Sequence, residues 1–121
     1  MRRYLLGHRQ SYGTPQLSDE WGEFDYYIEI EEQFALRQVN VFENGEMLRY
    51  SREHWCDGYG MMFIGKYSLK EKASRGCQII DQRAFEFVWN RSLDSTNWER
   101  QKNTAKMSIW GSWSERIGSD H

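Results

Sequence analysis

Apolar and polar residues alternate between residues 24 and 32 with the period of two that a β-strand produces. Tyr26, Ile28 and Ile30 fall on one face of this segment, and Tyr27, Glu29 and Glu31 fall on the other. We expect a half-buried strand that packs one face on a core and carries carboxylates into water on the other.

The segment 36–50 holds a hairpin signal, because two apolar-rich stretches flank the pair Asn44-Gly45. An Asn-Gly pair between strands is typical of a two-residue type I′ turn, since both residues accept a positive φ. In that register Val41 faces Leu48 on the core side of the hairpin, and Phe42 faces Met47 on its polar side. Further along, the apolar run at residues 61–64 predicts a short buried strand.

A helix is predicted at residues 82–91, where Phe85, Val88 and Trp89 form one apolar stripe. Asp81 directly precedes it and is a good N-cap residue. We expect this helix to lie against the sheet through its stripe. Residues 104–113 predict a final strand or helix.

The chain of 121 residues has the length of one domain. We expect a single α+β domain over residues 1–121, with a mostly antiparallel sheet of four to six strands and one main helix packed on one face. Residues 1–20 are rich in Gly, Ser, Thr and Gln and predict an irregular N-terminal arm, with at most a short strand at residues 4–6. Residues 114–121 predict a frayed tail.

Charge is unevenly distributed along the chain, and this bears on function more than the overall composition does. Residues 19–57 contain eleven acidic and three basic residues, a local net charge of −8, although the whole chain carries only −2. Such a surface attracts basic proteins at long range and repels nucleic acid. The alternative is an ordinary solvated sheet face whose charge is offset in space by the later bases.

Three residues in one loop, His54, Cys56 and Asp57, are the best candidates for chemistry. A His-x-Cys pair supplies two metal ligands, or a thiolate with a nearby base. The usual spacing of a structural zinc site is absent, as are phosphate-binding glycine loops and the Gly-x-Ser-x-Gly motif. We therefore expect no cofactor. Cys56 and Cys77 are expected to be free thiols, with a single bridge between them as the alternative.

The basic and aromatic residues of the last third form a third candidate site, for single-stranded nucleic acid. They are Arg91, Trp98, Arg100, Lys102, Lys106, Trp110 and Trp113. No apolar run reaches the roughly 20 residues of a membrane span, and the start lacks the apolar stretch of a secretory signal, so we expect a cytoplasmic protein.

The middle of the chain contains four distinctive strings, LRQVNVFENG at 36–45, LRY at 48–50, EH at 53–54 and DGYG at 57–60. Through these strings the chain resembles a group of small uncharacterised bacterial proteins. Members typically open with an acidic, tyrosine-rich strand, here DYYIEI at 25–30, and close with a Phe-x-x-x-Trp helix, here Phe85 to Trp89. This resemblance implies a fold and supplies no catalytic set. In size and charge the chain also resembles immunity proteins of bacterial toxin systems.

The leading hypothesis is a non-enzymatic protein-binding module that neutralises a basic toxin through an acidic, aromatic face. The expected contact residues are Asp19, Glu20, Trp21, Glu23, Asp25, Tyr27, Glu29, Glu31 and Glu32. The alternatives are a small metal- or thiol-dependent enzyme centred on the His54 loop and a single-strand nucleic-acid binder that uses the last third of the chain.

Overall fold

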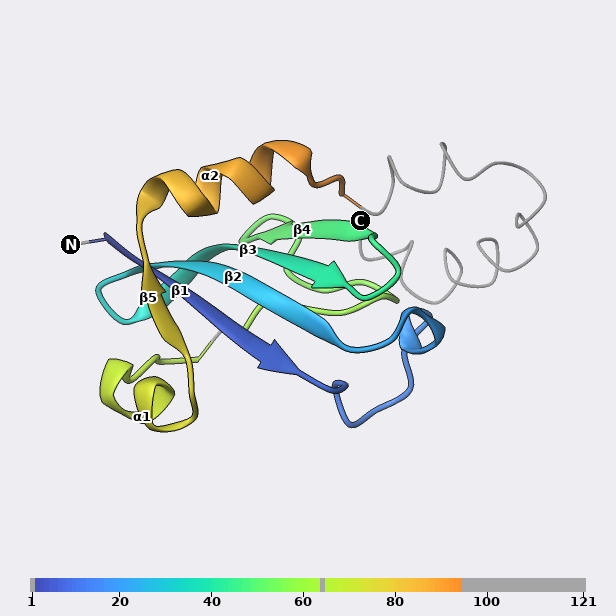
Figure 1. Cartoon of the computed structure of the whole chain (residues 1–121), viewed down its shortest axis with the longest axis horizontal. Helices are drawn as coiled ribbons and strands as arrows, with labels where there is room; N and C mark the ends of the chain where they lie inside the picture. Colours follow the sequence, from blue (N-terminus) through green and yellow to red (C-terminus); the bar gives the residue numbers. More distant parts are fainter. Residues whose placement is uncertain (1, 64, 95–121) are drawn as a thin grey trace.

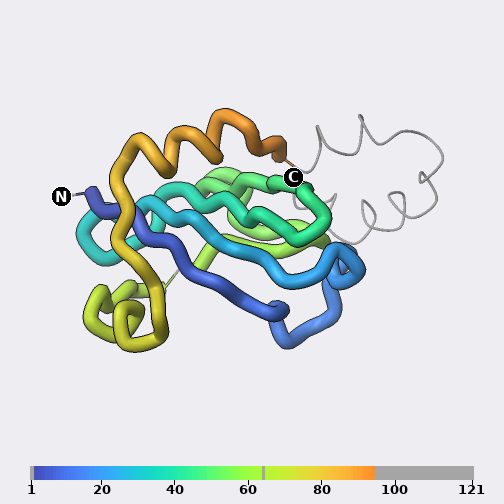
Figure 2. Tube along the Cα trace, viewed as in Figure 1, coloured from blue at the N-terminus to red at the C-terminus, as the bar shows by residue number. Residues whose placement is uncertain are grey.

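The computed structural model describes residues 2–63 and 65–94. Its elements are, in chain order, β1 (Arg2–Arg9), the 3₁₀ turn η1 (Asp19–Trp21), β2 (Phe24–Glu31), β3 (Phe34–Phe42), β4 (Met47–Ser51), α1 (Leu69–Ser74), β5 (Gln78–Ile80) and α2 (Gln82–Arg91). The strands form one five-stranded sheet in the order β4-β3-β2-β1-β5, and all four pairings are antiparallel. Figures 1 and 2 show α2 running across one face of this sheet. The predicted α+β class is confirmed.

The first strand corrects the expectation of an irregular arm over residues 1–20. β1 pairs with β2 on one side and β5 on the other, so it lies inside the sheet. Tyr4 and Leu5 point to opposite faces, and both are buried. A strand covered on both faces shows no alternation of apolar and polar residues, which is why the pattern did not reveal it. Only residues 10–18, between β1 and η1, are irregular.

The β3–β4 hairpin forms where the sequence predicts it, but its register is shifted by one residue. Val41 pairs with Met47, and Asn40 pairs with Leu48. Gly45 has a φ of +93°, whereas Asn44 does not adopt a positive φ. The connection is therefore a type I turn closed by a left-handed glycine, since a type I′ turn needs positive φ at both central residues.

That single shift turns β3 over relative to β4, so that Leu48 keeps the core side while Val41 no longer shares it. Val39 and Val41 turn toward the face that carries α2, while Asn40 and Phe42 turn toward the opposite face. The opposite face holds the main core, which contains Leu5, Ile28, Ile30, Leu48 and Tyr50 from the sheet and Tyr59, Met62 and Tyr67 from the segment after β4.

The segment between β4 and α1 covers the core face largely without regular structure. The strand predicted at 61–64 does not form, because Met61 makes only an isolated bridge to Cys56 and the next two residues belong to no strand. Residue 64 lies outside the described part. Short α1 follows, with Ser68 as its N-cap, and was not predicted.

Helix α2 spans the predicted residues. The side chain of Asp81 accepts a hydrogen bond from the backbone N–H of Ala84, and Phe85 and Val88 are buried against the sheet. No helix in the described part is long and apolar enough to cross a membrane. The elements expected at 104–113 and 114–121, and the basic and aromatic residues beyond position 94, lie outside the described residues.

Candidate functional site

The structure divides the nine predicted contact residues among three places along β2. Asp19, Glu20 and Trp21 form η1, and Glu23 and Asp25 flank the first residue of β2. Tyr27 and Glu29 lie in the middle of the strand. Glu31 ends the strand, and Glu32 follows it in the turn to β3. The nine residues therefore do not form one continuous acidic face.

Glu29 is the clearest correction, because its carboxylate was expected in water and is only 1% exposed. It lies on the face that α2 covers and accepts hydrogen bonds from Arg37 Nε at 2.7 Å, Arg37 Nη2 at 3.0 Å and Tyr4 Oη at 3.0 Å. Arg37 also donates to Glu86 on α2, at 2.8 Å and 3.2 Å. Glu29 thus anchors the helix to the sheet.

Glu31 is also neutralised by a base. Arg2 Nε donates to its carboxylate at 2.9 Å, and another guanidinium nitrogen of Arg2 lies 3.6 Å from Glu29. Glu32 has a φ of +59° in the tight turn after β2. These positions lie at the far end of β2 from η1.

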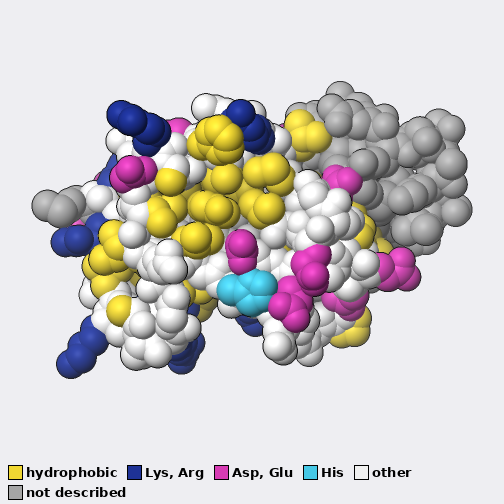
Figure 3. All heavy atoms as spheres, in the orientation of Figure 1, with side chains coloured by type: hydrophobic (Ala, Val, Ile, Leu, Met, Phe, Trp, Pro, Cys, Tyr) yellow, Lys and Arg dark blue, Asp and Glu magenta, His cyan; other side chains and the backbone are white. Residues whose placement is uncertain are grey.

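The four other acidic residues of the predicted face form a separate cluster together with Glu43, and we call this cluster the acidic end. It contains Asp19, Glu20, Glu23, Asp25 and Glu43. Glu43 lies beside the start of β2, because its Oε1 accepts the backbone N–H of Glu23 at 2.7 Å. Within residues 2–63 and 65–94, none of these five carboxylates is ion-paired with Lys or Arg. Figure 3 shows acidic side chains gathered beside a histidine on the face viewed.

His8 is the positive group of the acidic end. The β1–β2 register sets it opposite Asp25. Its Nδ1 lies 2.7 Å from Asp25 Oδ1, and its Nε2 lies 2.7 Å from Glu23 Oε1. Two carboxylates around one ring favour the imidazolium form, in which both nitrogens donate. The hydrogen bond with Asp25, followed by that with Glu23, raises the pKa of His8 above its usual value.

The raised pKa of His8 gives a direct test of the cluster. Proton NMR titration of the imidazole should place its pKa above the usual 6.5 or so. Asp25→Asn should move it back toward that value, because the largest cause of the shift is removed. Glu53→Gln removes an acidic residue from the loop after β4 and should leave the titration of His8 unchanged. A pKa of His8 at or below the usual value would contradict the geometry.

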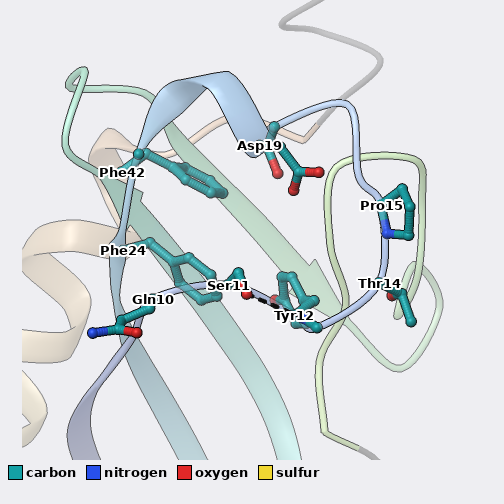
Figure 4. A pocket seen from close by; sticks show the side chains of 11 residues that line it. Gln10, Ser11, Tyr12, Thr14, Pro15, Asp19, Phe24 and Phe42 are labelled. Carbon is teal, nitrogen blue, oxygen red and sulfur yellow. Dashed lines mark hydrogen bonds between the residues drawn. The ribbon is translucent and has the colours of Figure 1, made fainter.

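A pocket of about 350 Å³ opens at the same end of the sheet. Residues 10–15, Ser18 and Asp19 form one wall, and the rings of Phe24 and Phe42, with centroids 5.1 Å apart, form another. Figure 4 shows the carboxylate of Asp19 beside the same cavity as the two rings. An apolar wall beside a carboxylate suits the aliphatic stem and the charged head of a Lys or Arg side chain.

The two aromatic residues of the predicted face differ in their surroundings. Trp21 is half-buried, with its ring stacked on Tyr59 at 5.2 Å and edge-on to Phe42 at 5.1 Å, so it supports the pocket wall from within. Tyr27 is half-buried on the α2 face, paired across the sheet with Leu6.

Three apolar side chains lie beside His8 and Asp25 on the face of the sheet that carries α2. We call Leu6, Tyr27 and Val41 the apolar strip. Figure 3 shows hydrophobic side chains between α2 and the acidic groups.

The His54 loop is a structural network. Asp57 is buried, and its Oδ1 accepts from the hydroxyl of Tyr50 and the backbone N–H groups of Tyr59 and Gly60, at 2.8 to 3.0 Å. Its Oδ2 lies 2.9 Å from His54 Nε2. All four contacts hold the loop on the core. Cys56 and Cys77 form no disulfide bond with each other. No group of three His, Cys, Asp or Glu side chains in the described part is placed to hold a metal ion.

Sequence reasoning missed His8, Glu43 and the ring pair of the pocket. His8 joins the acidic end through the β1–β2 pairing, and Glu43 joins it through the β2–β3 pairing. Neither contact leaves a local pattern, although His8 alternates with Leu6 and Tyr4 as one face of a strand would. Searches of the chain against family models, curated proteins and solved structures found no match.

Proposed function

We propose that this chain is a non-catalytic protein-binding module that receives a basic surface of a partner protein at its acidic end. The observation that carries the proposal is the group of five carboxylates without a Lys or Arg ion-pair partner in the described residues, beside the pocket and the apolar strip. Charge of one sign beside apolar surface is typical of a surface that steers a partner and then holds it.

In this mechanism the acidic end accelerates encounter, and the pocket and the apolar strip slow dissociation. A Lys or Arg side chain of the partner enters the pocket with its stem along Phe24 and Phe42 and its charge at Asp19. The partner also covers Tyr27, because large rings at the centre of an interface contribute much of its binding energy. The resemblance to immunity proteins suggests a bacterial toxin as the partner, blocked at its active site or substrate path.

The test is association with a basic toxin encoded next to the gene for this chain, identified from the genome and measured by biolayer interferometry at low and at physiological salt. Glu20→Lys should slow association about 10-fold at low salt, because Glu20 is exposed and its reversal weakens the steering field. The matched reversal Glu53→Lys, in the loop after β4, should change the rate less than twofold or so.

Asp19→Asn tests the pocket separately. The amide keeps an oxygen that can accept the backbone N–H of Gln16, as Asp19 does now at 3.1 Å. The loss of charge should raise the dissociation rate about 10-fold, because a close charge pair is removed. Absence of any complex at low salt, or equal effects of Glu20→Lys and Glu53→Lys, would overturn the proposal.

A further inference from the structure

A second pocket, of about 370 Å³, lies on the face of the sheet opposite α2. Tyr26 of β2 and Gln38 of β3 contribute from the sheet, and Lys72 and Cys77 contribute from α1 and the residues after it. None of the five carboxylates of the acidic end lines this pocket, and neither does the apolar strip, although His8, which is bound by two of those carboxylates, does. Its volume is at the lower end of the range of small-molecule sites.

Arg9, Lys72 and Arg75 line this pocket together with His8, and no acidic side chain does. Lys72 Nζ lies 4.8 Å from the ring centroid of Tyr67 and 5.2 Å from that of Phe63. Arg9 lies over the ring of Tyr12 at 5.0 Å. Ring contacts of this kind hold a cation in place without neutralising it. Within the described residues neither Arg9 nor Lys72 has an ion-pair partner, whereas Arg75, the third cation, is paired with Glu71 at 2.7 Å.

A fixed aromatic ring contributes to the wall of the pocket. The ring of Tyr26 lies over Gly7 of β1, its partner in the sheet. A Cβ atom on residue 7 would lie only 2.3 Å from this ring, so only glycine leaves room for it. Its hydroxyl lies 3.2 Å from Cys77 Sγ. Burial, reinforced by this hydrogen bond, raises the pKa of Tyr26, so the hydroxyl remains protonated. The side chain of Gln38, also part of the wall, is buried, and its Nε2 donates a hydrogen bond to Asn40 Oδ1 at 2.8 Å.

We propose that this pocket binds a small planar molecule that carries a carboxylate or phosphate group. The anionic group lies between Arg9 and Lys72, which have no other counter-charge in the described part. The planar body lies against the rings of Tyr26 and Phe63, since flat apolar groups stack on such surfaces. A cationic molecule of the same size is excluded by like charge. This binding function is separate from the docking of a protein at the acidic end.

Matched one-ring probes test the proposal on the whole chain. Phenyl phosphate and benzoate are titrated against ¹⁵N-labelled protein, with benzyl alcohol as the neutral match and benzylamine as the cationic match. At least one anion should give saturable shifts of the amides of Arg9, Tyr26, Lys72 and Cys77. Benzyl alcohol should bind about 10-fold more weakly and benzylamine not measurably. The tighter of the two anions identifies the anionic group.

Variants separate this pocket from general charge effects. Lys72→Gln should weaken binding of the anion about 10-fold, whereas Arg83→Gln, the same charge change on an exposed position of α2, should not weaken it. Spectra of the free variants show whether the fold is retained. In a Cys56→Ser background, bound anion should also slow alkylation of Cys77 by iodoacetamide.

Three results would overturn the proposal. They are the absence of saturable binding of both anions up to about 10 mM, equal affinity for benzyl alcohol, and equal weakening by Lys72→Gln and Arg83→Gln.

Discussion

Arg37→Ala should lower the free energy of unfolding by about 3–5 kcal/mol, the range for breaking a buried ion pair from one side. The guanidinium joins Glu29 on the sheet to Glu86 on α2, and it lies 4.8 Å and 4.7 Å from the ring centroids of Phe85 and Trp89. Its removal leaves the carboxylate of Glu29 buried without its main counter-charge. Urea unfolding followed by circular dichroism measures the change.

Two further variants separate the charge from the packing. Arg37→Met keeps most of the apolar contact with the helix and should cost nearly as much as Arg37→Ala if the buried carboxylate is the cause. Arg2→Ala removes an exposed partner of Glu31 and should cost far less than Arg37→Ala, because surface ion pairs contribute little to stability. If Arg37→Ala costs no more than Arg2→Ala, the ion pair does not hold α2 to the sheet.

The same network predicts loss of stability in acid. Burial alone would raise the pKa of Glu29, but the hydrogen bonds from Arg37 and Tyr4 outweigh it, so the pKa is lowered. The hydrogen bond from Arg37 likewise lowers the pKa of Glu86. A lowered pKa in the folded state stabilises the fold above the unfolded value of about 4.3 and stops doing so as the pH falls through the folded value. Arg37→Met should therefore flatten the pH dependence of stability below about pH 4.

The burial of Glu29 shows what alternation along a strand can and cannot predict. The pattern of β2 correctly indicated which residues share a face. It could not indicate that α2 covers Glu29 while Asp25, on the same face, remains exposed. That difference depends on where the helix crosses the sheet, which is set by contacts between segments far apart in the sequence. A base eight residues later, at Arg37, becomes informative only once the β2–β3 pairing is known.

The hairpin after β3 shows a second limit. An Asn-Gly pair is compatible with a type I′ turn and with a type I turn that ends in a left-handed glycine, and these turns differ by one residue in register. The structure adopts the second, which buries Phe42 beside Phe24 and Trp21. The local sequence is compatible with both turns. The type I turn that forms allows Phe42 to pack against Phe24 of β2 and Trp21 of η1, which lie far from it in the sequence.

Helix α2 was predictable because its signals are local. Asp81 caps it, and the stripe of Phe85 and Val88 is buried as the spacing indicates. The acidic end was predictable in part, since Asp19 to Asp25 are close in sequence. The second pocket, on the face opposite α2, was not predictable, because only the fold brings Arg9 and Lys72 to the same cavity.

Asp57→Ala should lower the free energy of unfolding by about 3 kcal/mol or more, because it leaves three buried donors without an acceptor at roughly 1–3 kcal/mol each. These donors are the hydroxyl of Tyr50 and the backbone N–H groups of Tyr59 and Gly60. The segment that they fix covers the core face of the sheet, so its release exposes Leu48 and Met62 to water. Asp57→Asn retains one acceptor oxygen and should cost less in the same urea titration.

The pH dependence of these variants tests whether His54 and Asp57 act as a structural pair. The hydrogen bond to Asp57 raises the pKa of His54, although burial opposes it. A raised folded pKa stabilises the protein fully below the unfolded value of about 6.5 and no longer does so once the pH rises through the folded value. The wild-type chain should lose this increment on the alkaline side, and Asp57→Asn should lose little, since the charge that favours the imidazolium is gone. Equal alkaline losses in both proteins would show that Asp57 does not hold the proton on His54.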